Sequence, residues 1–118
     1  MEPGVDGGPR PFGPLVGGSL AKLTQTELEQ ALRTLHGWTV KDGMIVRTYP
    51  HESFPEAVLF VNAVAHLAEK MNHHPDVDIR YSTITVALVT HDQGGITGKD
   101  VELATQIEGI RKKTAACA

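Results

Sequence analysis

Apolar residues recur at helical spacing in three segments of the chain, and each segment opens with a hydroxyl residue followed three positions later by an acidic residue. This pairing is typical of a helix start, because the two side chains can bind backbone amides of the first turn. The three pairs are Thr26 with Glu29, Ser53 with Glu56, and Thr97 with Asp100. The pattern predicts helices over about 26–35, 53–71 and 98–113.

The same periodicity predicts which helical side chains face the core, because residues three or four apart share one helix face. These inward sets are Leu28, Ala31, Leu32 and Leu35 in the first helix, Val58, Val61, Ala65, Ala68 and Met71 in the second, and Leu103, Ala104, Ile107 and Ile110 in the third.

Two pairs of short segments between the helices have strand character. Residues 38–41 and 44–49 flank Asp42-Gly43, a two-residue hairpin signal, and residues 77–81 and 83–90 form a second pair in which apolar and polar positions alternate. The predicted order is therefore α-β-β-α-β-β-α. We expect an α+β fold in which a four-stranded antiparallel sheet has helices packed on one face.

Composition limits the classes of protein to consider. The chain has 118 residues and a net charge of −3, which suits one domain and argues against electrostatic binding of nucleic acid. Residues 1–19 are rich in Gly and Pro, so we interpret them as a flexible tail before a single domain over 20–118. One cysteine, no secretory signal and no apolar run long enough for a membrane helix predict a soluble, cytoplasmic protein.

Three histidines stand at predicted element ends: His73 and His74 follow the second helix, and His91 follows the last strand. An imidazole, with an ordinary pKa of roughly 6.5, can donate or accept a proton near neutrality. If the three share a pocket, they could perform acid/base chemistry; solvated or helix-capping histidines would give the same pattern. Glu69 lies one helical turn before His73 and could orient an imidazole, or could simply be solvated.

A metal site is the main alternative for this cluster. The possible ligands are His66, His73, His74, His91, Asp76 and Asp78. No two histidines have the four-residue spacing of a zinc-binding helix and there is no cysteine pair, so we expect no metal. His66 is expected on the polar surface of its helix.

The histidines belong to a longer pattern: Glu69, three residues, His73-His74-Pro75, five residues, Tyr81, nine residues, His91, eight residues, Asp100. This pattern resembles the signature of the pterin-4a-carbinolamine dehydratases, and the resemblance extends over about 23–115. It implies a small α+β fold, no cofactor, and assembly into homodimers or homotetramers. The implied reaction converts 4a-hydroxytetrahydropterin, released by aromatic amino acid hydroxylases, into quinonoid dihydropterin during tetrahydrobiopterin recycling.

The resemblance also implies roles for particular residues. His73, His74 and His91 would be catalytic, with His73 and His91 as acid and base and His74 holding the pterin, while Glu69 would orient its neighbouring histidine. The implied substrate-binding residues are Asn72, His73, His74, Pro75, Val89, Thr90, His91 and Asp92.

Two other functions are compatible with the sequence. Some animal members of the family stabilise the dimer of a homeodomain transcription factor, so a protein-binding dimerisation module or transcriptional coactivator is an alternative; it would use a helix or sheet surface and not the histidines. A metal-dependent hydrolase is a third possibility, which the ligand spacing disfavours.

Overall fold

A computed structural model describes residues 21–117, with side chains as far as Arg111. The predicted tail over 1–19 lies outside the described residues. The elements in chain order are α1 (Gln25–Thr34), β1 (Thr39–Lys41), β2 (Met44–Pro50), α2 (Phe54–Met71), β3 (Asp76–Arg80), β4 (Thr83–Leu88), the short 3₁₀ helix η2 (His91–Gln93) and α3 (Gly98–Cys117).

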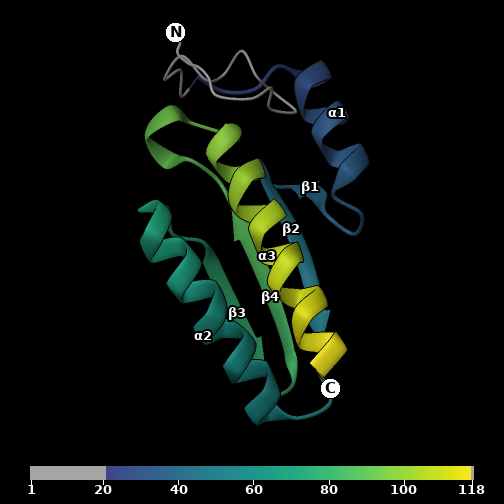
Figure 1. Ribbon diagram of the computed structural model, residues 1–118. Coiled ribbons are helices and arrows are strands. Elements are labelled where there is room, and N and C mark those ends of the chain that lie inside the picture. Colours follow the sequence, from purple (N-terminus) through teal and green to yellow (C-terminus); the bar gives the residue numbers. More distant parts are fainter. Residues whose placement is uncertain (1–20, 118) are drawn as a thin grey trace, which may run out of the picture.

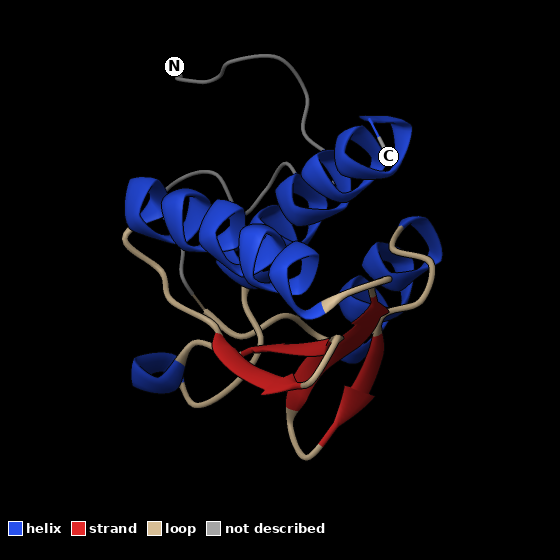
Figure 2. Ribbon diagram, turned by 90° about the horizontal axis from the view of Figure 1, so that it is seen from below, coloured by secondary structure: helices blue, strands red, loops and turns tan. Residues whose placement is uncertain are grey.

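The four strands form one antiparallel sheet in the order β1-β2-β4-β3. Helices α2 and α3 lie side by side against one face of this sheet (Figure 1), and Figure 2 shows these two long helices on that side of the strands. The predicted order and the α+β architecture are confirmed. Among the described strands, β3 pairs with β4 alone and is therefore an edge strand.

The core lies between the sheet and the helices. Along β4, Ile84, Val86 and Leu88 are buried and alternate with half-buried neighbours, as the sequence predicts. The inward stripe of α3 is also confirmed, since Leu103, Ala104 and Ile107 are fully buried, with Ile110 packed at its edge.

The predicted inward set of α2 is partly confirmed, because Ala68 belongs to the core and Val61 and Met71 pack against it. The buried residues of α2 are Ala57, Phe60, Val64 and Ala68. Of the predicted set, Ala68 alone is buried, while Ala65 is exposed. Helix α2 has apolar residues on nearly every side, so several stripes fit its sequence; the aromatic contact of Phe60 with Tyr49, at a centroid distance of 4.7 Å, belongs to the stripe that the fold uses.

The N-cap of helix α1 lies two residues earlier than predicted. Thr24, and not Thr26, caps the helix: its side chain accepts from the Glu27 amide, and the Glu27 carboxylate accepts from the Thr24 amide. The sequence contains both Thr-x-x-Glu pairs, and tertiary structure selects the first. Leu23, just before the cap, donates its amide to the Ile96 carbonyl at 2.9 Å, which fixes where the chain enters the helix.

A polar cluster joins α3 to the first hairpin. One oxygen of Glu108, Oε2, accepts hydrogen bonds from Trp38 Nε1 at 3.0 Å, Arg47 at 3.2 Å and Tyr49 Oη at 2.5 Å. Arg47 also donates to the His36 carbonyl and passes beneath Gly37, where an added Cβ would lie 2.4 Å from the guanidinium. Gly37 also has φ +93°, so this corner requires glycine on both grounds.

Candidate active site

The end of α2 determines where the histidine pair begins. Asn72 adopts the left-handed conformation, with φ 53° and ψ 43°. The His73 amide donates to the Ala68 carbonyl at 3.0 Å and the Asn72 amide donates to the Glu69 carbonyl at 3.2 Å, which is the Schellman arrangement. Asparagine tolerates this conformation better than most residues. Asn72 therefore turns the chain so that His73 points back under the helices.

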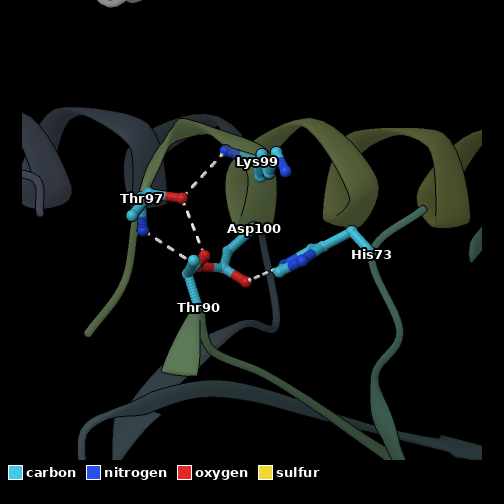
Figure 3. Close-up of polar contacts among 5 residues, drawn as sticks. All are labelled: His73, Thr90, Thr97, Lys99 and Asp100. Atoms are coloured by element: carbon cyan, nitrogen blue, oxygen red, sulfur yellow. Dashed lines mark hydrogen bonds and ion pairs between the residues drawn. The ribbon is translucent and has the colours of Figure 1, made fainter. Parts of the chain in front are cut away.

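His73 is buried and pairs with an acidic residue from α3. Its Nε2 atom lies 2.5 Å from Asp100 Oδ1, and the Asp100 side chain is fully buried (Figure 3). Some 10% of the His73 side chain remains exposed. Thus α2 and α3, separated by the second hairpin, together place an imidazole with one nitrogen bound and a part of the ring open to solvent.

The other oxygen of Asp100 is held by two threonines from either side of the η2 loop. Oδ2 accepts from Thr90 Oγ1 at 2.8 Å and from the Thr97 amide at 2.9 Å. The two threonine hydroxyls lie 2.8 Å apart, and Thr97 Oγ1 accepts from the Lys99 amide at 3.2 Å. Figure 3 shows the carboxylate of Asp100 between Thr90 and Thr97 on one side and His73 on the other.

Sequence reasoning placed Asp100 in a helix start with Thr97 and at the end of the histidine pattern, but did not pair it with His73. The cap is real, because Asp100 accepts from the Thr97 amide, but the same carboxylate also orients His73. Its separation of 27 residues from His73 hid the contact. The signal that could have revealed it was the position of Asp100 at the end of the histidine pattern.

His74 points away from this buried pair. It is more than half exposed, and its Nε2 atom lies 3.0 Å from Oε1 of the exposed Glu69. The four-residue spacing suggested a contact between Glu69 and His73; the contact is with His74, because the left-handed turn at Asn72 sends His73 inward. A pair this exposed contributes little to stability, so its effect is to orient His74.

The remaining predicted site residues lie around the same end of the sheet. His91 and Asp92 are exposed on η2, and His91 has no polar side-chain partner within residues 21–111. Pro75 and Val89 are half-buried, next to β3 and β4. The end of α2, the loop through η2 and the start of α3 meet there (Figure 1). No hydrogen bond joins His91 to His73 or His74 within the described residues.

Thr90 differs from the other predicted substrate-binding residues. It is buried, its amide and carbonyl both pair with Gly95, and its hydroxyl is engaged with Asp100 and Thr97. Its hydrogen-bonding groups therefore serve the protein's own network.

Among the side chains described, up to Arg111, no three His, Cys, Asp or Glu residues are grouped so that they could hold a metal ion. None of the helices in this part of the chain is both long and apolar enough to cross a membrane.

Comparison with known proteins agrees with the residue pattern. Residues 21–110 match the model of the family described as pterin 4 alpha carbinolamine dehydratase. The chain belongs to this family. A relative from Herpetosiphon aurantiacus, named provisionally as a pterin-4-alpha-carbinolamine dehydratase, is 52% identical over 88 residues, which cover 75% of this chain and 92% of the relative. A protein from Sulfurisphaera tokodaii with the same provisional name is 47% identical over 77% of this chain and 98% of its own length.

Solved structures show the same fold. A crystal structure from Brucella melitensis, described as a transcriptional coactivator/pterin dehydratase, has a TM-score of 0.73 and 35% sequence identity, covering 75% of this chain and 97% of that one. A pterin dehydratase-like protein described as a RuBisCO assembly factor has a TM-score of 0.50 and 18% identity, covering 61% and 83% of the two chains. The second likeness concerns the fold alone.

Proposed function

We propose that this member of the pterin 4 alpha carbinolamine dehydratase family dehydrates 4a-hydroxytetrahydropterins to quinonoid dihydropterins, with His73, His74 and His91 as its catalytic residues. The observation that carries the proposal is the His73–Asp100 pair, which is buried except for about a tenth of the His73 side chain. A buried carboxylate that orients a histidine is the arrangement expected of a proton-transfer site.

The reaction needs one proton donor and one proton acceptor. The C4a–O bond breaks as the departing hydroxyl takes a proton and leaves as water, while the proton on N5 is removed and a double bond forms between N5 and C4a. No electrons are gained or lost overall, so the step requires no redox cofactor. General acid and base groups typically contribute about 10²–10⁴-fold each to such transfers.

The surroundings of the histidines suggest how the two roles are divided. His73 suits the base that takes the N5 proton, because Asp100 stabilises the positive charge that the imidazole then acquires. His91, exposed on η2, suits the acid that protonates the departing hydroxyl. His74, oriented by Glu69, would hold the pterin. Asn72, Pro75, Val89 and Asp92 would line the pocket with their backbones or side chains.

The test is the conversion of freshly generated 4a-hydroxytetrahydropterin by the purified chain, followed by the absorbance of the quinonoid product against the spontaneous reaction. A chelator is included so that a contaminating metal cannot supply the activity. We expect clear acceleration by the wild type in chelator. A rate equal to the spontaneous rate would contradict the proposal and leave a protein-binding role as the better account.

Two features of the surface support assembly into homodimers or homotetramers as part of this proposal. Val77 and Ile79 on the edge strand β3 are 37% and 45% exposed, and Leu59 on α2 is 66% exposed. An uncovered edge strand has free backbone groups on one side, and apolar side chains beside it favour pairing with another copy.

The pathway is a further part of the proposal. An enzyme with this activity would act after an aromatic amino acid hydroxylase, which releases the hydroxylated pterin, and would contribute to the recycling of tetrahydrobiopterin. The alternative, a dimerisation module or coactivator, is supported by the exposed Leu59 and by the description of the Brucella structure.

A further inference from the structure

The hydrogen bonds around Asp100 have a fixed direction. Thr90 Oγ1 donates to Asp100 Oδ2, and this uses the single proton of the Thr90 hydroxyl. The hydrogen bond between the two threonines must therefore run from Thr97 Oγ1 to Thr90 Oγ1. Thr97 Oγ1 in turn accepts from the Lys99 amide. Each hydroxyl thus donates once and accepts once, and the chain of donors ends at Asp100.

This direction determines the state of the His73 ring. Asp100 Oδ2 accepts from the Thr90 hydroxyl and the Thr97 amide, and an ionised aspartate side chain has no proton to donate. Its remaining oxygen, Oδ1, lies 2.5 Å from His73 Nε2. Because a carboxylate cannot donate, the proton in this contact must be on Nε2. In neutral His73 the lone pair that can accept a proton is then on Nδ1.

Nδ1 is also the His73 nitrogen that solvent can reach. It forms no hydrogen bond to any described residue. It is not fully buried either, because among the described residues the buried side-chain atom without a partner is His51 Nδ1. Since the exposed tenth of the His73 side chain is the part that solvent can reach, the ring presents its free lone pair there.

We propose that Thr90 and Thr97 are positioning residues that fix His73 as its Nε2–H tautomer and so make Nδ1 the atom that accepts the substrate proton. The inference rests on the proposed dehydratase activity for its catalytic meaning, but the tautomer itself is independent of any substrate. Thr90 thereby acts through Asp100 and not by contact with the pterin. Both threonines are suited to this role, because they are 4% and 0% exposed and cannot exchange their partners for water.

The experiment measures the tautomer and the kinetics of the same proteins. Long-range ¹H–¹⁵N correlation spectra of the full chain, labelled with ¹⁵N in histidine, distinguish Nε2–H from Nδ1–H imidazole, and the His73 signals are identified by their loss in His73→Gln. We expect Nε2–H in the wild type at a pH where the ring is neutral. A wild-type Nδ1–H tautomer would overturn the proposal without the use of any threonine variant.

Variants of Thr90 test the positioning role. Thr90→Ser keeps the hydroxyl and should keep both the tautomer and kcat. Thr90→Val replaces only the hydroxyl, so Asp100 loses one donor; we expect a mixture of tautomers and a kcat about 10-fold lower, with KM changed less than about 2-fold, as is common when a group that orients a site residue is removed. Thr97→Val, compared with Thr97→Ser, provides the same comparison if Thr90→Val does not fold.

The outcomes separate this inference from the proposed function. An unchanged tautomer in the valine variants would overturn the positioning role, and an altered tautomer with unchanged kcat would overturn the assignment of Nδ1 as the proton acceptor. If the wild type shows Nε2–H and the valine variants lose it, but no dehydration is detected in any protein, the positioning role stands and the proposed reaction fails.

Discussion

Removal of the Glu108 carboxylate should destabilise the fold more than the loss of any exposed charge. In Glu108→Ala, Trp38 Nε1 and Tyr49 Oη lose their hydrogen-bond acceptor, and Arg47 keeps only the His36 carbonyl. A donor left unsatisfied in the interior costs about 1–3 kcal/mol. Two donors are left unsatisfied in this variant. Water can offset part of the loss of the ion pair, because the Arg47 and Glu108 side chains are 16% and 18% exposed. We therefore expect a cost of about 3–5 kcal/mol in the free energy of unfolding.

Urea denaturation followed by tryptophan fluorescence measures this cost, since Trp38 is the single tryptophan and belongs to the cluster. Glu108→Gln retains one acceptor oxygen but not the charge, so it should fall between the wild type and Glu108→Ala. Glu69→Ala is the matched control on an exposed acidic residue and should lower the free energy of unfolding by less than about 0.5 kcal/mol. A cost below about 1 kcal/mol for Glu108→Ala would refute the view that this cluster holds α3 to the hairpin.

Two further predictions concern alkaline stability and assembly. Burial, followed by the hydrogen bond to Glu108, raises the pKa of the Tyr49 phenol well above its usual value near 10. The stabilisation from the neutral phenol should therefore be complete below about pH 10 and decline as pH rises above it, because the unfolded state then ionises first. Between pH 9 and 11, the urea midpoint should fall less steeply in Tyr49→Phe than in the wild type or in the Tyr81→Phe control; equal slopes would refute this. For assembly, Ile79→Lys on the edge of β3 should lower the sedimentation coefficient relative to the wild type, whereas Thr48→Lys on β2 should not, and an unchanged oligomer in Ile79→Lys would exclude the β3 edge as the interface.

The sequence predicted the order of the elements because the local signals agree with one another. The Asp42-Gly43 turn and the alternation along 83–88 have few competing interpretations, and the structure has φ 54° and 78° at the two turn residues. The α2 stripe was less certain, since a helix that is apolar on most sides does not show from periodicity alone which side meets the sheet. The packing of Phe60 on Tyr49 shows which side of α2 meets the sheet.

The candidate site was predictable in its membership more than in its contacts. The pattern identified the histidines, but the partner of His73 comes from α3, 27 residues away, and no local rule pairs residues at that separation. The threonines that hold Asp100 likewise come from either side of the η2 loop. Helical spacing predicted a contact between Glu69 and His73. The left-handed conformation of Asn72 turns His73 inward, so Glu69 contacts His74 instead.

The most direct test of the central claim is the dehydration rate of His73→Ala at near-neutral pH in chelator, compared with the wild type and with His66→Ala. His66 is exposed on α2 and lies outside the site, so it controls for the loss of a histidine. If His73 is the proton acceptor, its variant should lose about 10²-fold or more in kcat while circular dichroism shows an intact fold, and His66→Ala should stay within about 2-fold of the wild type. Wild-type turnover by a folded His73→Ala protein would contradict the account.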